Sequence, residues 1–120
     1  MALRFEALVI DCGDTQRVGA FWAALLGRQL TGPDGDGNYF IEATDVSPEL
    51  FFARVPEGKT VKNRLHIDLR PDDQAAEVER ATALGAHPVD VGQGDVSWVV
   101  LADPEGNEFC ILRSRQPADN

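Results

Sequence analysis

The stretch "RLHIDLRPDDQAAEVERATALG", residues 64–85, contains the transition from strand to helix that decides the fold. Residues 64–70 alternate between polar and apolar side chains, which is the pattern of a strand with one buried face. The following residues open with Pro71 and acidic side chains and end at Gly85, which are start and stop signals of a helix. We therefore predict a strand over residues 64–70 and a helix over residues 71–85.

The alternation also predicts which side chains of this strand share a face. One face carries the apolar side chains Leu65, Ile67 and Leu69. The other face carries Arg64, His66, Asp68 and Arg70. Burial of a Leu or Ile side chain is worth about 1.5–3 kcal/mol, so we expect the apolar trio to pack under the helix. His66 and Asp68 then face a cleft as neighbours at positions i and i+2.

The same order of elements occurs earlier in the chain. Residues 13–27 have the apolar stripe of a helix, which either Asp14 or Thr15 can cap. Asp14 and Asp73, near the two helix starts, are 59 positions apart. Gly27 and Gly85 at the two helix ends are 58 positions apart. The remaining segments with strand patterns are residues 4–12, 39–43, 49–55, 86–91, 96–103 and 108–113. An internal duplication is the simplest explanation.

The duplication predicts an α+β fold of two βαβββ modules within a single domain, residues 1–120. Module one covers about residues 1–56, a polar linker about 57–63, and module two about 64–114. With one helix for about four strands, each sheet should be mixed and largely antiparallel, with its helix on one face. Two curved sheets of this kind would surround a cleft.

The composition excludes several classes of protein. The net charge of −9 disfavours binding to nucleic acid, and the uncharged run Val18–Gly27 is too short to span a membrane. The charged start does not resemble a secretory signal, so we expect a cytoplasmic location. Cys12 and Cys110 lack the spacing of a disulfide framework, which favours free thiols in a reducing compartment.

Three motifs give the chain a family resemblance. They are the "D-x6-FW-x4-G" run over 14–27, "LHIDLRPDD" over 65–73 and "VVLADPEGNEF" over 99–109. Together with the repeat, they resemble the vicinal oxygen chelate superfamily of glyoxalases, bleomycin-resistance proteins and extradiol dioxygenases. Within it the chain is most similar to the short glyoxalase-like domains of actinobacteria. The resemblance implies paired βαβββ modules around a cleft, usually within a homodimer.

The resemblance also implies a metal site, from which this sequence departs. Enzymes of the superfamily hold one divalent metal with His or Glu at four strand positions, two in each module. The matching positions here are Ala7, Phe51, His66 and Cys110. Alanine and phenylalanine have no ligand atom, and catalytic zinc sites normally have three protein ligands. We therefore predict that the fold is kept, that the family's metal site is lost and that no cofactor is needed.

The candidate catalytic residues are His66 and Asp68. Asp68 could orient the imidazole, and His66 could transfer a proton near neutral pH; alternatively, His66 is a polar cleft residue without a catalytic role. The candidate ligand-binding residues are Phe51, Trp98, Glu108 and Cys110. Cys110 is either a nucleophile near His66 or a small buried apolar residue. Trp98 fits either the cleft or the core face.

Three functions are consistent with these residues. The first is binding of a small organic molecule without a metal, as in bleomycin-resistance proteins. The second is a lyase, isomerase or dioxygenase that uses His66 with a divalent metal or as a general base. The third is an interaction domain with a vestigial cleft. Loss of two ligand positions favours the first and third, and whether the chain is an enzyme stays open. The expected partners are a small organic ligand and a second copy of the chain.

Overall fold

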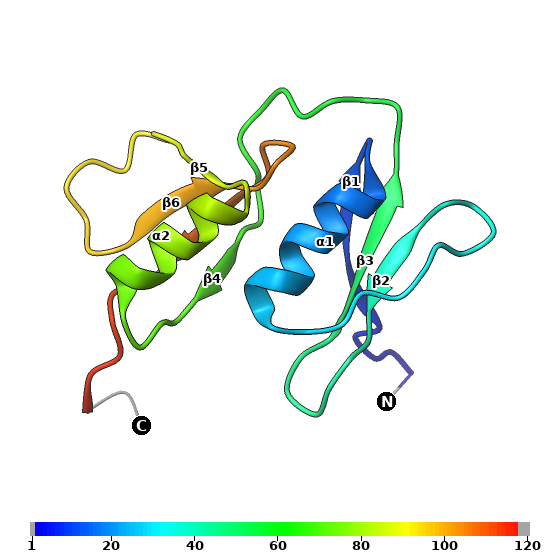
Figure 1. Cartoon of the computed structure of the whole chain (residues 1–120), viewed down its shortest axis with the longest axis horizontal. Coiled ribbons are helices and arrows are strands. Elements are labelled where there is room, and N and C mark those ends of the chain that lie inside the picture. Colours follow the sequence, from blue (N-terminus) through cyan, green and yellow to red (C-terminus); the bar gives the residue numbers. More distant parts are fainter. Residues whose placement is uncertain (1, 118–120) are drawn as a thin grey trace. The chain divides into compact units, whose positions relative to one another are not determined.

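The computed structural model describes residues 2–117 and divides the chain into two compact units (Figure 1). The first unit ends at Gly58 and the second begins at Lys59. This division falls inside the predicted linker, and a single domain built from both units stays a prediction. Neither helix in the described part of the chain is long and apolar enough to cross a membrane.

The first unit is a three-stranded mixed sheet with one helix. Its elements are β1 (Ala7–Cys12), α1 (Thr15–Leu26), β2 (Tyr39–Ile41) and β3 (Glu49–Arg54). The strand order is β1-β3-β2, with β1 parallel and β2 antiparallel to β3. The parallel pair requires a crossover connection, and that connection contains α1. Phe52 and Ile41 from the sheet and Val18 and Trp22 from the helix are almost completely buried in the core.

Helix α1 begins and ends where its capping residues predict. The side chain of Asp14 accepts a hydrogen bond from the Arg17 backbone N–H at 3.0 Å, as an N-cap residue does. Gly27 ends the helix with φ of 64°, a left-handed conformation that glycine adopts at little cost. A Cβ atom on the buried Gly19 would lie 3.3 Å from the Phe52 ring, so glycine allows the helix to approach β3 closely.

The second unit is a four-stranded mixed sheet with one helix. Its elements are β4 (Ile67–Leu69), α2 (Gln74–Leu84), β5 (His87–Pro88), β6 (Val99–Ala102) and β7 (Glu108–Ile111). The strand order is β4-β7-β6-β5, in which only the β4–β7 pair is parallel. The core contains Leu101, Phe109 and Ile111. The predicted α+β fold with two mixed sheets is therefore confirmed.

The duplication extends to the hydrogen-bond register of the sheets. Val9 pairs with Phe51 in the first unit, and Asp68 pairs with Cys110 in the second. Both members of the second pair lie 59 positions after their counterparts, which is also the spacing of the helix caps Asp14 and Asp73. Phe51 and Cys110 thus occupy equivalent places in the two sheets.

The first unit departs from the predicted βαβββ order. In place of a fourth strand it has only an isolated bridge between Thr31 and Phe40. Gly32 and Pro33 follow Thr31 directly, and a proline has no N–H with which to continue a strand ladder. The predicted cleft stays a prediction.

The predicted strands were too long, most clearly at residues 64–70. Strand β4 contains only Ile67–Leu69, because it pairs with β7 over those three residues alone. Leu65 is 82% exposed, so the prediction that it packs under the helix is wrong. Ile67 and Leu69 are half-buried, as expected for the apolar face.

Candidate functional site

The second unit contains a half-open pocket of about 370 Å³. Its floor is the sheet face opposite to the one that buries Phe109 and Ile111, because alternate residues of a strand point to opposite faces. The lining residues come from the segment before β4, the β5–β6 connection and strands β4, β6 and β7. They are Lys62, Asn63, His66, Asp68, Val91, Gly92, Gln93, Trp98, Val100, Glu108, Cys110 and Leu112.

His66 and Asp68 lie together on this face. His66 immediately precedes β4, and its Nε2 atom is 3.1 Å from Oδ1 of Asp68. Their side chains are 44% and 49% exposed, so a ligand in the pocket can reach both. The carboxylate is placed to orient the imidazole, as the alternation predicts. A catalytic role for the pair stays a prediction.

Cys110 is on the neighbouring strand β7 and is 5% exposed. Burial raises the pKa of its thiol, and the charge of Asp68 and a hydrogen bond with Asp68 raise that pKa further. A raised pKa keeps the thiol protonated, whereas a nucleophilic cysteine needs the thiolate. The surroundings of Cys110 in the metal-free chain therefore favour a buried thiol over a nucleophile.

The side chains of His66, Asp68 and Cys110 form one cluster. One ligand atom from each residue lies within 4.8 Å of the others. The sequence identified all three residues but did not predict that they form a set, because only His66 and Cys110 match family ligand positions. The missed signal is non-local: Asp68 pairs directly with Cys110 across the parallel β4–β7 ladder.

Two of the four metal-ligand positions that the resemblance implies lack a ligand atom in this chain. Ala7 and Phe51, the first-unit counterparts of His66 and Cys110, offer no ligand atom. A hard divalent ion such as Mg²⁺ or Ca²⁺ prefers several oxygen ligands. The cluster of His66, Asp68 and Cys110 offers one carboxylate beside an imidazole and a thiol.

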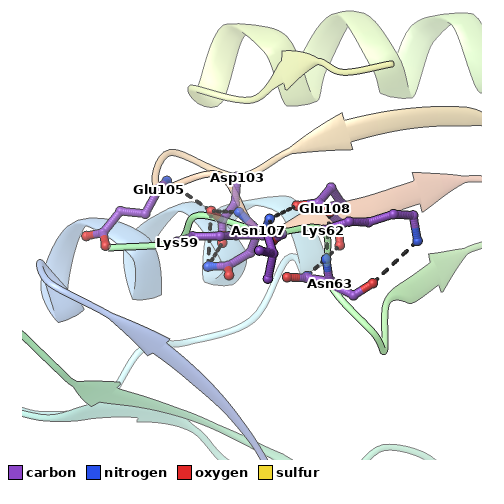
Figure 2. Close-up of polar contacts among 8 residues, drawn as sticks. Lys59, Lys62, Asn63, Asp103, Glu105, Asn107 and Glu108 are labelled. Atoms are coloured by element: carbon purple, nitrogen blue, oxygen red, sulfur yellow. Dashed lines mark hydrogen bonds and ion pairs between the residues drawn. The ribbon is translucent and has the colours of Figure 1, made fainter. Parts of the chain in front are cut away.

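Glu108 holds the segment before β4 against the start of β7, as Figure 2 shows. Its carboxylate pairs with Lys59 and accepts a hydrogen bond from the Asn63 backbone N–H at 2.8 Å. Burial raises the pKa of Glu108, whereas the hydrogen bonds from Lys59 and Asn63 and the charge of Lys59 lower it, and on balance the pKa lies below its ordinary value of 4.5. Glu108 lines the pocket, but its carboxylate is already engaged, and a ligand-binding role for it stays a prediction. Sequence reasoning missed Lys59 and Asn63, which it assigned to a linker.

The turn between β6 and β7 sets the position of Glu108 (Figure 2). Asp103 is completely buried, and its Oδ1 atom accepts hydrogen bonds from the backbone N–H groups of Glu105 and Asn107 at 2.9 and 3.0 Å. Gly106 has φ of +95°, which glycine adopts without strain. The motif "DPEGN" therefore acts here as a tight turn.

The two remaining aromatic candidates lie in different units. Trp98, in the second unit, lines the pocket and is 40% exposed. The other tryptophan of the chain, Trp22, was not a candidate and is 1% exposed in the core of the first unit. Phe51 is half-buried on β3 and is not among the residues that line this pocket. A ligand-binding role for Phe51 stays a prediction.

Comparisons with known proteins agree with this architecture. A family model described as "Glyoxalase-like domain" matches residues 7–112. No curated protein sequence matches the chain significantly.

Three solved structures illustrate the shared fold. A glyoxalase/bleomycin resistance protein/dioxygenase family enzyme from Burkholderia phytofirmans has a TM-score of 0.69 at 19% identity, covering 92% of this chain and 98% of that one. A second is a mutant fosfomycin resistance protein, FosX, from Listeria monocytogenes, complexed with Mn(II) and 1S,2S-dihydroxypropylphosphonic acid. Its TM-score is 0.68 at 13% identity, and the match covers 96% of this chain and 92% of that one. The third is TnmS3, an antibiotic binding protein from a Streptomyces species. Its TM-score is 0.62 at 18% identity, and the match covers 96% of this chain and 99% of that one. At these identities the likeness concerns the fold.

Proposed function

This chain belongs to the glyoxalase-like domain family, and from that premise we propose that the pocket of its second unit binds a small organic molecule. In this proposal the four-position metal site of the superfamily has been lost. Ala7 and Phe51 support that part, because neither side chain can bind a metal ion. The pocket supports the binding function.

The observation that carries the proposal is the combination of an exposed aromatic ring with a polar pair in one pocket. At about 370 Å³ the pocket is within the range of about 300–1,000 Å³ that is typical of small-molecule sites. Trp98 offers a ring on which a flat molecule can stack, and His66 with Asp68 offers hydrogen bonds. The carboxylate of Asp68 and the net charge of −9 favour a neutral or cationic ligand.

The names of two structural neighbours agree with a binding function of this kind. TnmS3 is described as an antibiotic binding protein, and FosX as a fosfomycin resistance protein. These descriptions concern those proteins, and they make antibiotics sensible members of a ligand screen.

The experiment is a thermal-shift screen of flat neutral and cationic compounds, followed by titration of tryptophan fluorescence. A compound that binds in the pocket should quench Trp98, and the Trp98→Phe variant should lose that response while the signal of Trp22 remains. His66→Ala should weaken binding, with His87→Ala as the matched control, since His87 does not line the pocket. Equal binding by the two histidine variants, or no stabilising compound in the screen, would contradict the proposal.

A second candidate function is a lyase, isomerase or dioxygenase that uses His66 with a divalent metal or as a general base. The cluster of His66, Asp68 and Cys110 favours keeping this candidate. Turnover of a substrate that His66→Ala abolishes and His87→Ala leaves unchanged would support it over simple binding.

We also propose that the protein is a cytoplasmic homodimer. The buried positions of Cys12 and Cys110, two cysteines without the spacing of a disulfide framework, support a reducing compartment. The open edges of the two sheets support a second copy as partner, because unpaired strand edges are normally covered.

A further inference from the structure

We propose that His66, Asp68 and Cys110 bind a thiophilic or borderline metal ion such as Zn²⁺, within the second unit alone. His66 and Cys110 match two of the four family ligand positions, whereas the third ligand, Asp68, lies outside that set and the first unit contributes none. The proposed ion site is also independent of the organic ligand, because the metal ion alone is sufficient to test it.

The backbone fixes the positions from which the three side chains project. Asp68 and Cys110 are direct partners in the parallel β4–β7 ladder, so their side chains lie beside each other on one face. His66 is two residues before Asp68 and lines the same pocket. Asp68 therefore projects from β4, His66 from the residue just before β4, and Cys110 from the neighbouring strand β7.

The distances are close to those of a tetrahedral zinc site. With Zn–N and Zn–O bonds of about 2.1 Å and a Zn–S bond of about 2.3 Å, ligand atoms lie about 3.4–3.6 Å apart. Nε2 of His66 is 3.1 Å from Oδ1 of Asp68, and all three ligand atoms are within 4.8 Å of one another. His66 and Asp68 are about half exposed, so small rotations of these two side chains can bring them to the ion.

The ligand set selects the class of ion. A thiolate favours zinc and copper(I), whereas magnesium and manganese prefer sites built from oxygen. Binding replaces the S–H bond of Cys110 with an S–metal bond and releases the proton to solvent, so the carboxylate and thiolate balance a divalent charge. Three protein ligands leave the fourth position to water or to a pocket ligand.

The cluster of His66, Asp68 and Cys110 has no counterpart in the described part of the chain. Within residues 2–117 it is the one group of three or more His, Cys, Asp or Glu side chains close enough to share an ion. The second buried cysteine, Cys12, belongs to no such group, and it provides the matched control.

The test uses Co²⁺ as a spectroscopic probe on the reduced, metal-free full chain. The wild type should bind one ion per chain, with a thiolate-to-cobalt charge-transfer band and the strong visible bands of four-coordinate cobalt. Zn²⁺ should displace the cobalt, whereas Mn²⁺ should not. Cys110→Ser should lose the charge-transfer band and bind at least about ten-fold more weakly, while Cys12→Ser should match the wild type.

His66→Ala and Asp68→Asn provide the test if Cys110→Ser does not fold, because both positions are about half exposed. Each should weaken binding at least about ten-fold and retain the wild-type circular dichroism spectrum. A six-coordinate cobalt spectrum without a thiolate band would overturn the proposal. Tighter binding of Mn²⁺ than of Zn²⁺, or unchanged affinity in folded His66→Ala and Asp68→Asn, would do the same.

Discussion

Replacing Glu108 with glutamine should destabilise the chain at neutral pH and have little effect in acid. Glutamine keeps the shape of the side chain and an oxygen for the Asn63 N–H, but it loses the charge that pairs with Lys59. Hydrogen bonds to charged groups contribute about 1.5–3 kcal/mol, and Glu108 is only 9% exposed. We therefore expect Glu108→Gln to lower the free energy of unfolding by about 1.5–3 kcal/mol at pH 7.

The pH dependence follows from the direction of the pKa shift. The pKa of Glu108 in the folded chain lies below its ordinary value of 4.5. A group of this kind contributes its stability above pH 4.5, and that contribution is lost as the pH falls through the folded-state pKa. In acid the wild-type carboxyl group is neutral like the amide, so the difference between the two proteins should shrink toward zero.

The assay is urea unfolding of both proteins from pH 7 to the lowest pH at which they fold. Glu49→Gln is the matched control, since Glu49 occupies the equivalent place in the first unit. The reasoning fails if Glu108→Gln is as stable as the wild type at pH 7, or if the difference between them does not change with pH.

Three further predictions concern packing, backbone and assembly. Ile67→Ala should lower the free energy of unfolding by about 2 kcal/mol in a urea titration, because Ile67 is half-buried. Leu65→Ala, at an 82% exposed position, should change it by less than about 0.5 kcal/mol. Equal effects of the two variants would contradict the assigned faces. Gly27→Ala should cost about 1–2 kcal/mol, because φ there is 64°, and thermal melts against the exposed control Gly35→Ala check this. Light scattering should give about twice the chain mass of 13.1 kDa, and a value at the chain mass would count against the homodimer.

The helices were predictable because their signals are local. Residue type alone identified Gly27 as the end of α1 and limited the N-cap to Asp14 or Thr15, and the structure has Asp14 there. The strands were less predictable, because alternation shows which face a side chain occupies and not where a ladder ends. Leu65 continues the alternation of β4 but has no ladder partner, so it lies in solvent.

In the candidate site, too, local contacts were predictable from the sequence and contacts between distant segments were not. The His66–Asp68 contact follows from the i, i+2 spacing in an extended segment that leads into β4. The place of Cys110 beside Asp68 depends on the register between strands that are more than 40 residues apart, and the sequence indicated that register only through the repeat. The contact of Glu108 with Asn63 spans 45 residues and has no sequence signal.

The shared register of the two sheets has an evolutionary consequence. When one gene segment is present twice, each copy can acquire different side chains on the same scaffold while the core remains intact. Here the first unit carries Val9 and Phe51 where the second carries Asp68 and Cys110. An engineer can therefore use either sheet as a template for the other. The triple replacement Ala7→His, Val9→Asp and Phe51→Cys would transplant the polar cluster onto a backbone that already has the matching register.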